Sequence, residues 1–515
     1  MFNLTQPLRQ AVQAAADVLA TRFLDRDRTW SEVTERIARL AAALIARGLK
    51  PDDRVAVLAL NSDRYFELYY AVWWAGGAIV PLNTRWNDRE TVYALDDSES
   101  SMLFVDDAFL EVVPALLEGC GHIRTVVHMG EGEAREDLLS YESMVAAHEP
   151  AEDTMRAGDD LAGLFYTGGT TGFPKGVMLS HDGLYISGLG GMATAISDMP
   201  DYVFLHHAPM FHLADAMMIV TGSMLRCTHA MIPQFEPKAS LEAVQRFRAT
   251  NAIFVPTMLA MFVRHPDFDQ YDLSSLKLIG YGASPMPTAL LRETMERLPH
   301  TELFQGYGQT ELSPLATMLA PEDHVLEGPG SERLKSAGRV MPHCETEIVD
   351  ESLQPVPSGT IGQIRVRGPN VMLGYWKQPA LTAETIVDGW LLTGDAGYID
   401  EAGFLYVVDR VKDMIVSGGE NVYSVEVENA IMEHEGIGQC AVIGIPHEFW
   451  VEQVHALVVP KPGSEITEQE IIDHCHEHIA GYKCPRSVEI RREPLPLSGA
   501  GKVLKRELRP DKTTG

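Results

Sequence analysis

The first 150 residues alternate between two patterns of apolar positions. Residues 30–47 and 65–75 place apolar side chains three or four apart, as helices that pack on a core do. Residues 54–60 and 76–81 are short apolar runs suited to buried strands, and the second run ends in a turn at its proline. Helices and strands that alternate in this way predict an α/β fold with largely parallel sheets.

The alternation continues in the middle of the chain and then changes. Residues 251–256 and 276–281 are again short apolar runs suited to strands. Residues 345–350 and 361–367 instead alternate polar and apolar side chains, which is typical of half-exposed antiparallel strands. Gly and Pro turns separate these segments, so we expect a smaller β-rich subdomain here. The remaining C-terminal residues predict a small α+β domain.

A loop rich in Gly and Thr separates a predicted strand at residues 161–166 from a predicted helix at residues 182–196. The loop, residues 166–176, has the sequence Tyr-Thr-Gly-Gly-Thr-Thr-Gly-Phe-Pro-Lys-Gly. Gly lets the backbone approach a ligand closely, and successive N–H groups form a concavity that binds anions. Lys175 does not stand between Gly and a hydroxyl residue, so this is not a Walker A element. We predict a phosphate-binding loop of another kind; the alternative is an ordinary surface loop.

The length and the charge of the chain limit the classes of function that it can have. The 515 residues suffice for two or more domains, each with its own core. The formal net charge of −30 argues against binding to the nucleic-acid backbone. Residues 483–512 differ from the rest, with nine Lys and Arg against four acidic residues. A basic segment on an acidic body indicates an anionic ligand nearby, and the alternative is a solvated terminal helix.

The cysteines and histidines carry no signature of a metal or disulfide framework. The six Cys residues are scattered without a CxxC pair, so we expect neither a zinc site nor disulfides. His474, His476 and His478 alternate along a segment that resembles a helix surface more than a metal site. The N-terminus lacks a basic region followed by an apolar run, and no segment has the ~18 apolar residues of a spanning helix. We therefore expect a cytoplasmic protein without a membrane span.

Four further motifs become specific when their order along the chain is considered. They are Gly-Gly-Ala-Ile-Val-Pro-Leu-Asn at 76–83, Gln-Gly-Tyr-Gly-Gln-Thr-Glu at 305–311, Trp-Leu-Leu-Thr-Gly-Asp at 390–395 and Leu-Ser-Gly-Ala-Gly-Lys-Val-Leu-Lys at 497–505. Together with the Gly- and Thr-rich loop, they resemble the acyl-adenylate-forming superfamily. This superfamily contains acyl-CoA synthetases, firefly luciferases and the adenylation domains of peptide synthetases. The resemblance covers nearly the whole chain.

The resemblance implies a fold with a large and a small domain. Residues 1–409 would form the N-terminal domain, with two α/β sheets and a β-rich subdomain, and residues 413–515 a mobile α+β domain. Residues 410–412 would be the hinge, with Lys412 as the hinge residue. In this family ATP and a carboxylate first give an acyl-adenylate and pyrophosphate. A thiol, usually that of coenzyme A, then displaces AMP after the small domain has swung.

The resemblance also implies catalytic residues. Lys502 matches the Lys that bridges the carboxylate and the α-phosphate during adenylation, where it would stabilise developing charge. Glu311 matches the acid that binds Mg²⁺, and Thr310 the hydroxyl beside the α-phosphate. His212 matches a residue beside the acyl carboxylate. The residues alone leave plainer interpretations open: a solvent-exposed Lys502, a helix-start acid at Glu311 and a core histidine at 212.

The nucleotide is expected at several loops. Asp395 would bind the ribose hydroxyls, with Arg410 beside it, and Tyr307 would cover the adenine, with core packing as its alternative. The other implied contacts are Thr167, Gly168, Gly169, Thr170, Thr171, Gly172 and Lys175 for the phosphates, and Gly282, Ala283, Ser284, Gln305, Gly306 and Gly308 around the base.

The thiol would reach the adenylate through a tunnel lined by Gly418 and Gly419, where a side chain would block it. Three positions depart from the family pattern. Gly168 stands where most relatives have Ser, which removes one hydroxyl donor and predicts weaker binding of ATP. Ser424 replaces a common Pro, and Val451 replaces a common Gly.

The expected acyl pocket is apolar, with Met side chains as adaptable walls. Its candidate residues are His207, Phe211, Ala214, Met217, Met218, Tyr281, Gly306 and Leu312. Such a pocket suits a medium-chain, branched, thioether or aryl acid.

We therefore expect an AMP-forming acyl-CoA ligase that uses ATP, Mg²⁺ and coenzyme A. The alternatives are a stand-alone adenylation enzyme that loads a carrier protein, a luciferase-type oxygenase and a non-catalytic nucleotide sensor. A homodimer is compatible with the sequence.

Overall fold

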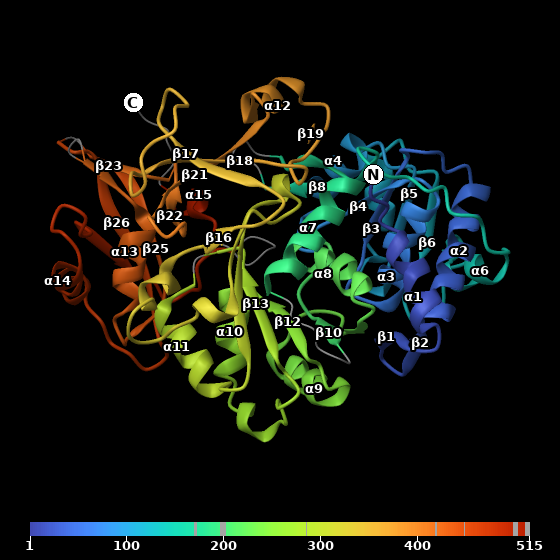
Figure 1. The fold of residues 1–515 in the computed structure, drawn as a ribbon, viewed down its shortest axis with the longest axis horizontal. Helices are drawn as coiled ribbons and strands as arrows, with labels where there is room; N and C mark the ends of the chain where they lie inside the picture. Colours follow the sequence, from blue (N-terminus) through green and yellow to red (C-terminus); the bar gives the residue numbers. More distant parts are fainter. Residues whose placement is uncertain are drawn as a thin grey trace.

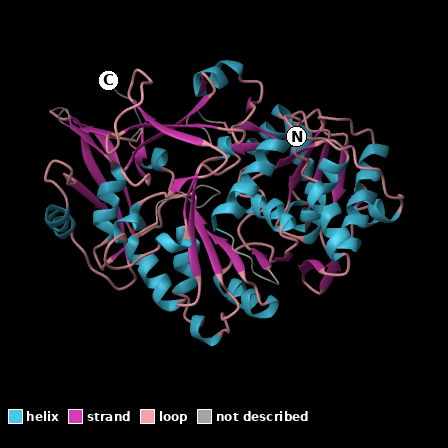
Figure 2. Ribbon diagram, viewed as in Figure 1, coloured by secondary structure: helices cyan, strands magenta, loops and turns pink. Residues whose placement is uncertain are grey.

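The computed structural model describes residues 1–168, 173–195, 202–284, 286–411, 413–417, 420–447, 449–497 and 503–509. Two large sheets and the helices around them form five layers (Figures 1 and 2). From one side to the other, these are helices α9–α11, sheet A, a central helical layer, sheet B, and helices α4 and α5. Sheets A and B have nine and eight strands, respectively.

The strands of sheet A, in spatial order, are β16 (Arg339–Val340), β15 (Thr317–Leu319), β14 (Glu302–Tyr307), β13 (Leu278–Gly282), β12 (Asn251–Phe254), β10 (Val203–His206), β11 (Thr228–Met231), β1 (Leu19–Phe23) and β2 (Arg26–Thr29). Those of sheet B are β19 (Gly374–Tyr375), β9 (Lys175–Ser180), β8 (Leu161–Thr167), β4 (Ala78–Pro81), β3 (Arg54–Leu58), β5 (Met102–Val105), β6 (Thr125–His128) and β7 (Leu139–Ser140).

The helices of the central layer are α1 (Gln6–Ala15), α2 (Trp30–Ala46), α3 (Asp63–Trp74), α7 (His181–Ala195) and α8 (Leu213–Met224), with α6 (Tyr141–Ala146) at its edge. The outer helices are α4 (Asp88–Asp97) and α5 (Val113–Gly119) on sheet B, and α9 (Pro237–Phe247), α10 (Pro256–Val263) and α11 (Thr288–Arg297) on sheet A.

Two five-stranded sheets follow in the C-terminal part of the chain. The first contains β17 (Glu345–Val349), β18 (Gly362–Arg367), β21 (Trp390–Ile399), β20 (Ile386–Val387) and β22 (Leu405–Arg410), with α12 (Pro379–Thr385) beside it. The second contains β24 (Glu420–Val422), β23 (Ile415–Ser417), β26 (Val451–Pro460), β25 (Ile437–His447) and β27 (Ser487–Ile490). It is accompanied by α13 (Ser424–Met432), α14 (Glu468–His478) and the short α15 (Lys505–Leu508).

The α/β fold predicted from the apolar pattern is confirmed. The segment predicted as a helix at 30–47 is α2, and the run at 54–60 is β3, which ends at Leu58. Strands β3, β4, β5, β6 and β8 pair in parallel, as the alternation indicated. The polar–apolar alternation at 345–350 and 361–367 corresponds to the antiparallel pair β17 and β18. Among the residues described, every helix is too short or too polar to cross a membrane.

Helix α3 lies at the centre of the fold and is buried on all sides. All of its residues from Asp63 to Trp74 are buried, and they include two carboxylates and a guanidinium. A buried charge costs several kcal/mol unless it is paired and hydrogen-bonded. The central layer must therefore supply partners for Asp63, Arg64 and Glu67.

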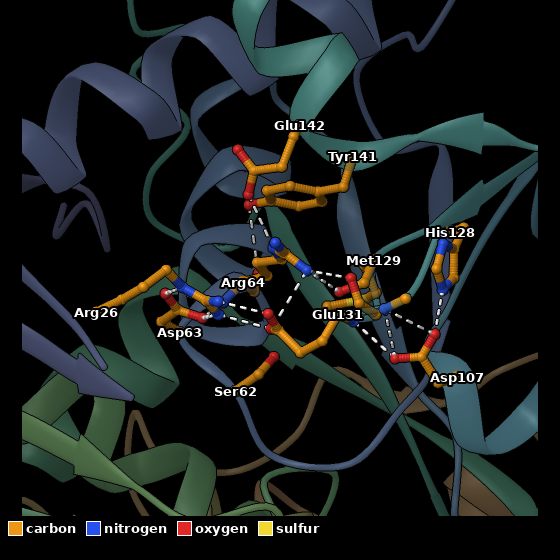
Figure 3. A network of polar contacts seen from close by, with 12 residues as sticks. Arg26, Ser62, Asp63, Arg64, Asp107, His128, Met129, Glu131, Tyr141 and Glu142 are labelled. Carbon is orange, nitrogen blue, oxygen red and sulfur yellow. Dashed lines mark hydrogen bonds and ion pairs between the residues drawn. The ribbon is translucent and has the colours of Figure 1, made fainter. Parts of the chain in front are cut away.

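An ion network from four surrounding segments supplies these partners, and Figure 3 shows the part of it around Asp63 and Arg64. Asp63, with no exposed surface, accepts hydrogen bonds from Arg26 at 2.8 and 3.0 Å and also pairs with Arg28. Arg64 donates to Glu142 at 2.8 Å and to the carbonyl oxygen of Met129 at 3.1 Å.

The same network continues on the other side of α3. Glu67 accepts from Arg36 at 2.7 Å and from the hydroxyl of Tyr141 at 2.8 Å. Glu142 joins this side to the first, because it pairs with Arg36 and with Arg64, and Glu131 pairs with both Arg26 and Arg64. Hairpin β1–β2, helix α2, helix α6 and the loop after β6 are thus fixed to one helix by charge.

We expect Asp63→Asn to lower the free energy of unfolding by about 3 kcal/mol, because it leaves Arg26 and Arg28 facing a neutral group. Burial raises the pKa of Asp63, but Arg26 and Arg28 outweigh it, so the pKa lies below its usual value. The stabilisation is therefore present above the unfolded pKa near ~3.9 and is lost as the pH falls through the lowered folded pKa. Urea denaturation followed by Trp fluorescence, at neutral pH and at acid pH, measures both effects.

The control is Asp27→Asn on the same hairpin. Asp27 pairs with Arg22 at 3.1 Å, but its side chain is 42 % exposed. Such surface pairs contribute only about 0–1 kcal/mol. Equal losses for the two variants would show that burial of the network is not what makes it important.

Candidate active site

The Gly- and Thr-rich loop leaves sheet B between β8 and β9. Thr167 ends β8, Lys175 begins β9, and the two residues are cross-strand partners in an antiparallel pair. A β carbon at Gly168 would meet no other atom within 4 Å, so the backbone there faces open space. Residues 169–172 lie outside the described residues. The two described ends of the loop, Thr167 and Lys175, therefore lie side by side where the loop leaves the sheet.

Tyr375 connects this loop to Glu311. The Nζ atom of Lys175 lies 4.5 Å from the centre of the Tyr375 ring, and the Tyr375 hydroxyl donates to Oε1 of Glu311 at 2.8 Å. Burial, with the nearby charge of Glu311, raises the pKa of Tyr375, so its hydroxyl remains a neutral donor. The sequence analysis missed Tyr375, because a two-residue strand carries no periodicity. Glu311 itself is buried in a short 3₁₀ turn, Thr310–Leu312, with Thr310 half-buried beside it.

Asp395, Arg410 and Tyr307 converge from three strands. Asp395 on β21 and Arg410 on β22 are directly opposed in the sheet register, and Nε of Arg410 lies 2.7 Å from Oδ1 of Asp395. Tyr307, at the end of β14, donates its hydroxyl to Oδ2 of Asp395 at 2.8 Å. The structure therefore joins the residue predicted to cover the adenine to the residue predicted to bind the ribose. The contact also links sheet A to the β-rich subdomain.

The ends of β13 and β14 present backbone rather than side chains. A β carbon at Gly282 would lie 2.5 Å from the carbonyl oxygen of Gly306, and one at Gly308 would lie 2.0 Å from that of Pro314. Neither position accepts a side chain unless the backbone moves. Ala283, between them in space, has a φ of 65°, a region that residues with a β carbon rarely adopt. Ser284 and Gln305 are half-buried at the same edge.

His212 lies at the start of α8. It is half-buried, and its Nδ1 accepts the N–H of Ala214 at 3.3 Å, so the side chain caps the helix. Because α8 follows β10 in the chain, this position lies on the carboxyl side of that strand of sheet A.

Buried polar side chains hold the first turn of α8 in place. Oδ2 of Asp215 lies 2.7 Å from Nδ1 of His206, and Nε2 of His206 lies 2.8 Å from Nδ1 of His229. All three have no exposed surface. Burial raises the pKa of Asp215 and lowers that of His229 well below its usual value. The sequence did not indicate this series of hydrogen bonds, because its members come from β10, α8 and β11 and follow no common spacing along the sequence.

The structure divides the residues predicted for the acyl pocket between different layers. His207 faces α9, where it contacts Ser240 at 3.2 Å, and Tyr281 donates to His324 at 3.0 Å in the same outer core. Met217 is buried in the central layer, as is Leu312. These side chains therefore pack in two different layers, and their common role in an acyl pocket with Ala214 stays a prediction.

The other face of sheet A has a small apolar hollow beneath α8. It has a volume of about 20 Å³, and Phe204, Met218, Gly222, Leu278 and Phe304 are among its walls. Met218 therefore lines the hollow, whereas Met217 does not. Counting in steps of two along β13 could have identified this face, which runs from Leu278 through Gly280 to Gly282.

Several predicted residues cannot be placed. Gly169, Thr170, Thr171, Gly172, Lys412, Gly418, Gly419 and Lys502 lie outside the described residues. Phe211 is buried near the start of α8. Gly306 is half-buried, and a β carbon there would meet only the side chain of Leu315, at 2.7 Å.

Two family comparisons cover most of the chain. Residues 8–376 match the AMP-binding enzyme family, and residues 426–502 match the AMP-binding enzyme C-terminal domain. A feruloyl-CoA synthase from Amycolatopsis is 38 % identical over 505 residues, which is 98 % of this chain and 97 % of that protein. The fatty acid–[acyl-carrier-protein] ligase ScoC of Streptomyces coeruleorubidus is 34 % identical over 94 % of this chain and 91 % of its own length. An indoleacetate–CoA ligase of Aromatoleum aromaticum is 34 % identical over 95 % of this chain and 94 % of its own length.

Solved structures resemble the whole chain as well. ATP-bound MatB from Rhodopseudomonas palustris is 31 % identical, with a TM-score of 0.89 and coverage of 99 % of this chain and 98 % of that one. The same enzyme without ligand has the same identity and coverage but a TM-score of 0.80. The anthranilate CoA ligase AuaEII with anthranoyl-AMP is 26 % identical, with a TM-score of 0.90. The match covers 98 % of this chain and 96 % of that one. The arrangement of this chain is thus closer to the ATP-bound than to the ligand-free form of MatB.

The fold, the residues that converge at the strand ends and the relatives lead to one conclusion. This chain belongs to the family of AMP-binding enzymes and is one of its AMP-forming acyl-CoA ligases.

Proposed function

We propose that this enzyme converts a compact apolar acid, with an aryl acid as the first candidate, to its coenzyme A thioester. The contact of Asp395 with Arg410 and Tyr307 carries the proposal, because it forms a ribose site at the edge where the acid and the phosphates would also meet. An ionised carboxylate can accept both ribose hydroxyls, and Arg410 holds it in that orientation. We place the reaction in the cytoplasm.

ATP would lie across the edges of both sheets. The base would rest between the backbone at 282–284 and Tyr307, and the β- and γ-phosphates would lie in the loop between Thr167 and Lys175. Lys175 begins β9 at the end of that loop, so its ammonium lies where the pyrophosphate would leave.

Glu311 and Thr310 would hold Mg²⁺ and the α-phosphate. The donor set fits this ion, because Glu311 accepts a hydrogen bond from the neutral Tyr375 and takes part in no ion pair among the described residues. Mg²⁺ prefers one or two carboxylates together with phosphate oxygens and water. When bound, it would neutralise phosphate charge during the attack on the α-phosphate.

The two half-reactions then require charge control rather than a covalent nucleophile. A carboxylate oxygen of the acid attacks the α-phosphorus, and pyrophosphate leaves as the acyl-adenylate forms. Lys502 would hold the two anions together in this step. The CoA thiol, on losing its proton, then attacks the acyl carbon, and AMP leaves as the thioester forms. His212 would lie beside the acyl carboxylate.

The shape of the acyl site supports a compact acid. The apolar hollow beneath α8 has a volume of about 20 Å³, room for about one water, so its walls must part to admit a larger acyl group. The side chains of Ile253 and Phe304 lie over Gly280, and that of Leu315 lies over Gly306, so apolar side chains cover this strand face. The relatives named for feruloyl, indoleacetate and anthranilate acids support the same choice.

A second acceptor for the acyl group is a carrier protein. The similarity to ScoC favours it, since that relative is named for transfer to an acyl-carrier protein. Rates of thioester formation with coenzyme A and with a phosphopantetheinylated carrier protein, measured on the same adenylated acid, distinguish the two acceptors.

Exchange of labelled pyrophosphate into ATP should depend on an aryl or other compact apolar acid when a panel of acids is tested. Lys502→Ala should lower this exchange at least ~100-fold, because a charge-stabilising donor is lost, yet spare thioester formation from a supplied acyl-adenylate. Lys461→Ala, an exposed Lys of the same domain, is the control and should leave both rates unchanged. No exchange with any acid would refute the proposed activity, and loss of both half-reactions in Lys502→Ala would refute the role of Lys502.

We expect Gly168→Ser to lower the KM for ATP by about tenfold, since a hydroxyl that bonds a charged group contributes ~1.5–3 kcal/mol. The new side chain meets open space, so the fold should tolerate it. Gly168→Ala adds the same β carbon without the hydroxyl and should leave the KM unchanged. If Ala and Ser act alike, the missing donor is not the reason for any weakness in ATP binding.

A further inference from the structure

A buried polar cluster connects the end of β22 to the C-terminal sheet. Asp409, 4 % exposed, accepts hydrogen bonds on Oδ2 from the backbone N–H and the hydroxyl of Ser424, the latter at 2.8 Å. Ser424 begins α13, whereas Asp409 is paired with Ala396 of β21. The cluster therefore spans the residues 410–412 that the family resemblance assigns to the hinge.

The C-terminal segment adds the cation of this cluster. The Nζ atom of Lys505 lies 2.7 Å from Oε1 of Glu428 on α13, and the same ammonium donates to the hydroxyl of Ser424. The side chains of Lys505 and Glu428 are only 16 % and 18 % exposed. The ammonium of Lys505 is therefore paired in the interior. This cation of the basic C-terminal segment is neither solvated nor free to bind a ligand.

The cluster is unbalanced in charge. Two carboxylates, Asp409 and Glu428, face one ammonium, and burial raises the pKa of both carboxyl groups while Lys505 opposes the rise. Loss of Lys505 would leave the two acids without a counter-charge. Arg509 is not available to replace it, because it pairs with Asp413 at 3.0 Å.

The position of Lys505 limits that of Lys502. Three residues of chain span at most ~11 Å, so a Lys505 held in this cluster would keep Lys502 within that distance of it. Val503 and Leu508 pack against the C-terminal sheet on either side of Lys505, and this packing fixes the segment further. On the other side of the cluster, Asp409 precedes Arg410, whose side chain holds Asp395.

We propose that Asp409, Ser424, Glu428 and Lys505 form a latch across the hinge that positions Lys502 for adenylation and opens at Asp409 before thioester formation. This proposal rests on the proposed function of Lys502. The higher TM-score with ATP-bound than with ligand-free MatB supports a closed latch in the adenylation arrangement. Asp409 and Arg410 are neighbours on β22. Arg410 would then respond to the bound nucleotide, and Asp409 would transmit that response to the mobile domain.

Asp409→Asn tests the latch in the full-length enzyme. The change keeps the shape but removes the charge that faces Lys505. We expect pyrophosphate exchange to fall about tenfold, within the range of common coupling energies, and thioester formation from a supplied acyl-adenylate to stay equal or to become faster. A parallel fall in both half-reactions, or no change in either, would overturn the latch.

Glu426→Gln is the matched control. Glu426 lies on the same helix and pairs with Lys483 at 2.6 Å, but this pair does not reach β22. Glu426→Gln should leave the ratio of the rates of the two half-reactions unchanged. A shift in that ratio as large as the shift caused by Asp409→Asn would also overturn the proposal.

Two further substitutions keep the proposal testable if Asp409→Asn fails to fold. Ser424→Ala removes the hydroxyl that joins Asp409 to Lys505 without changing any charge, and it should shift the ratio in the same direction by a smaller factor. Lys505→Arg should retain most of the exchange activity that Lys505→Met loses, because it keeps the counter-charge. An unchanged ratio in Ser424→Ala would count against the latch even if Asp409→Asn failed to fold. Absence of exchange in the unmodified enzyme would instead refute the proposed function.

Discussion

The neutralisation of helix α3 is the constraint on which the rest of this structure depends. A helix that is buried on every side has no solvent to stabilise Asp63, Arg64 and Glu67, so each must find a partner inside the protein. The partners come from segments that are far apart in sequence, and Glu131 and Glu142, both drawn in Figure 3, join them into one network. Because sheets A and B pack on opposite sides of this layer, the network also fixes the position of one sheet relative to the other.

That relative position creates the active site. The loop after β8 belongs to sheet B, the ends of β13 and β14 belong to sheet A, and Asp395 and Arg410 belong to a third sheet. Arg410 ends β22, its partner Asp395 lies within β21, and Tyr307 and Tyr375 are the side chains that join the groups across the sheets. Ligand sites at the carboxyl ends of strands are common in α/β folds, since the loops there are free to vary. Here the site needs three sheets to be in register, which makes it sensitive to changes in the central layer.

Much of the fold could be predicted from the sequence, because apolar periodicity reports burial directly. Strand β3 and helix α2 were predicted within two residues, and the motifs indicated Asp395 and Arg410, which the structure brings into contact. Burial alone does not say which layer a side chain faces. His207 and Met217 were placed in the acyl pocket for that reason, although the first faces α9 and the second lies in the central layer.

Polar clusters were not predictable for a different reason. Asp215, His206 and His229 meet only after three elements have packed, and Ser424 connects Asp409 to Lys505 across almost a hundred residues of chain. Such contacts have no local signature. Only the arrangement of the elements in space reveals them, so the positioning residues of the site are invisible to motif analysis even where its catalytic residues are not.

The burial of the α3 network also determines how this strongly acidic protein responds to ionic strength. The surface carries most of a net charge of −30, and dissolved ions screen repulsion between exposed charges over about 10 Å at ~0.1 M salt. The pairs around Asp63 and Glu67 have no exposed carboxylate, so the same ions screen them far less. We therefore expect salt to reduce repulsion between the surface charges while leaving the buried pairs of the central layer largely intact.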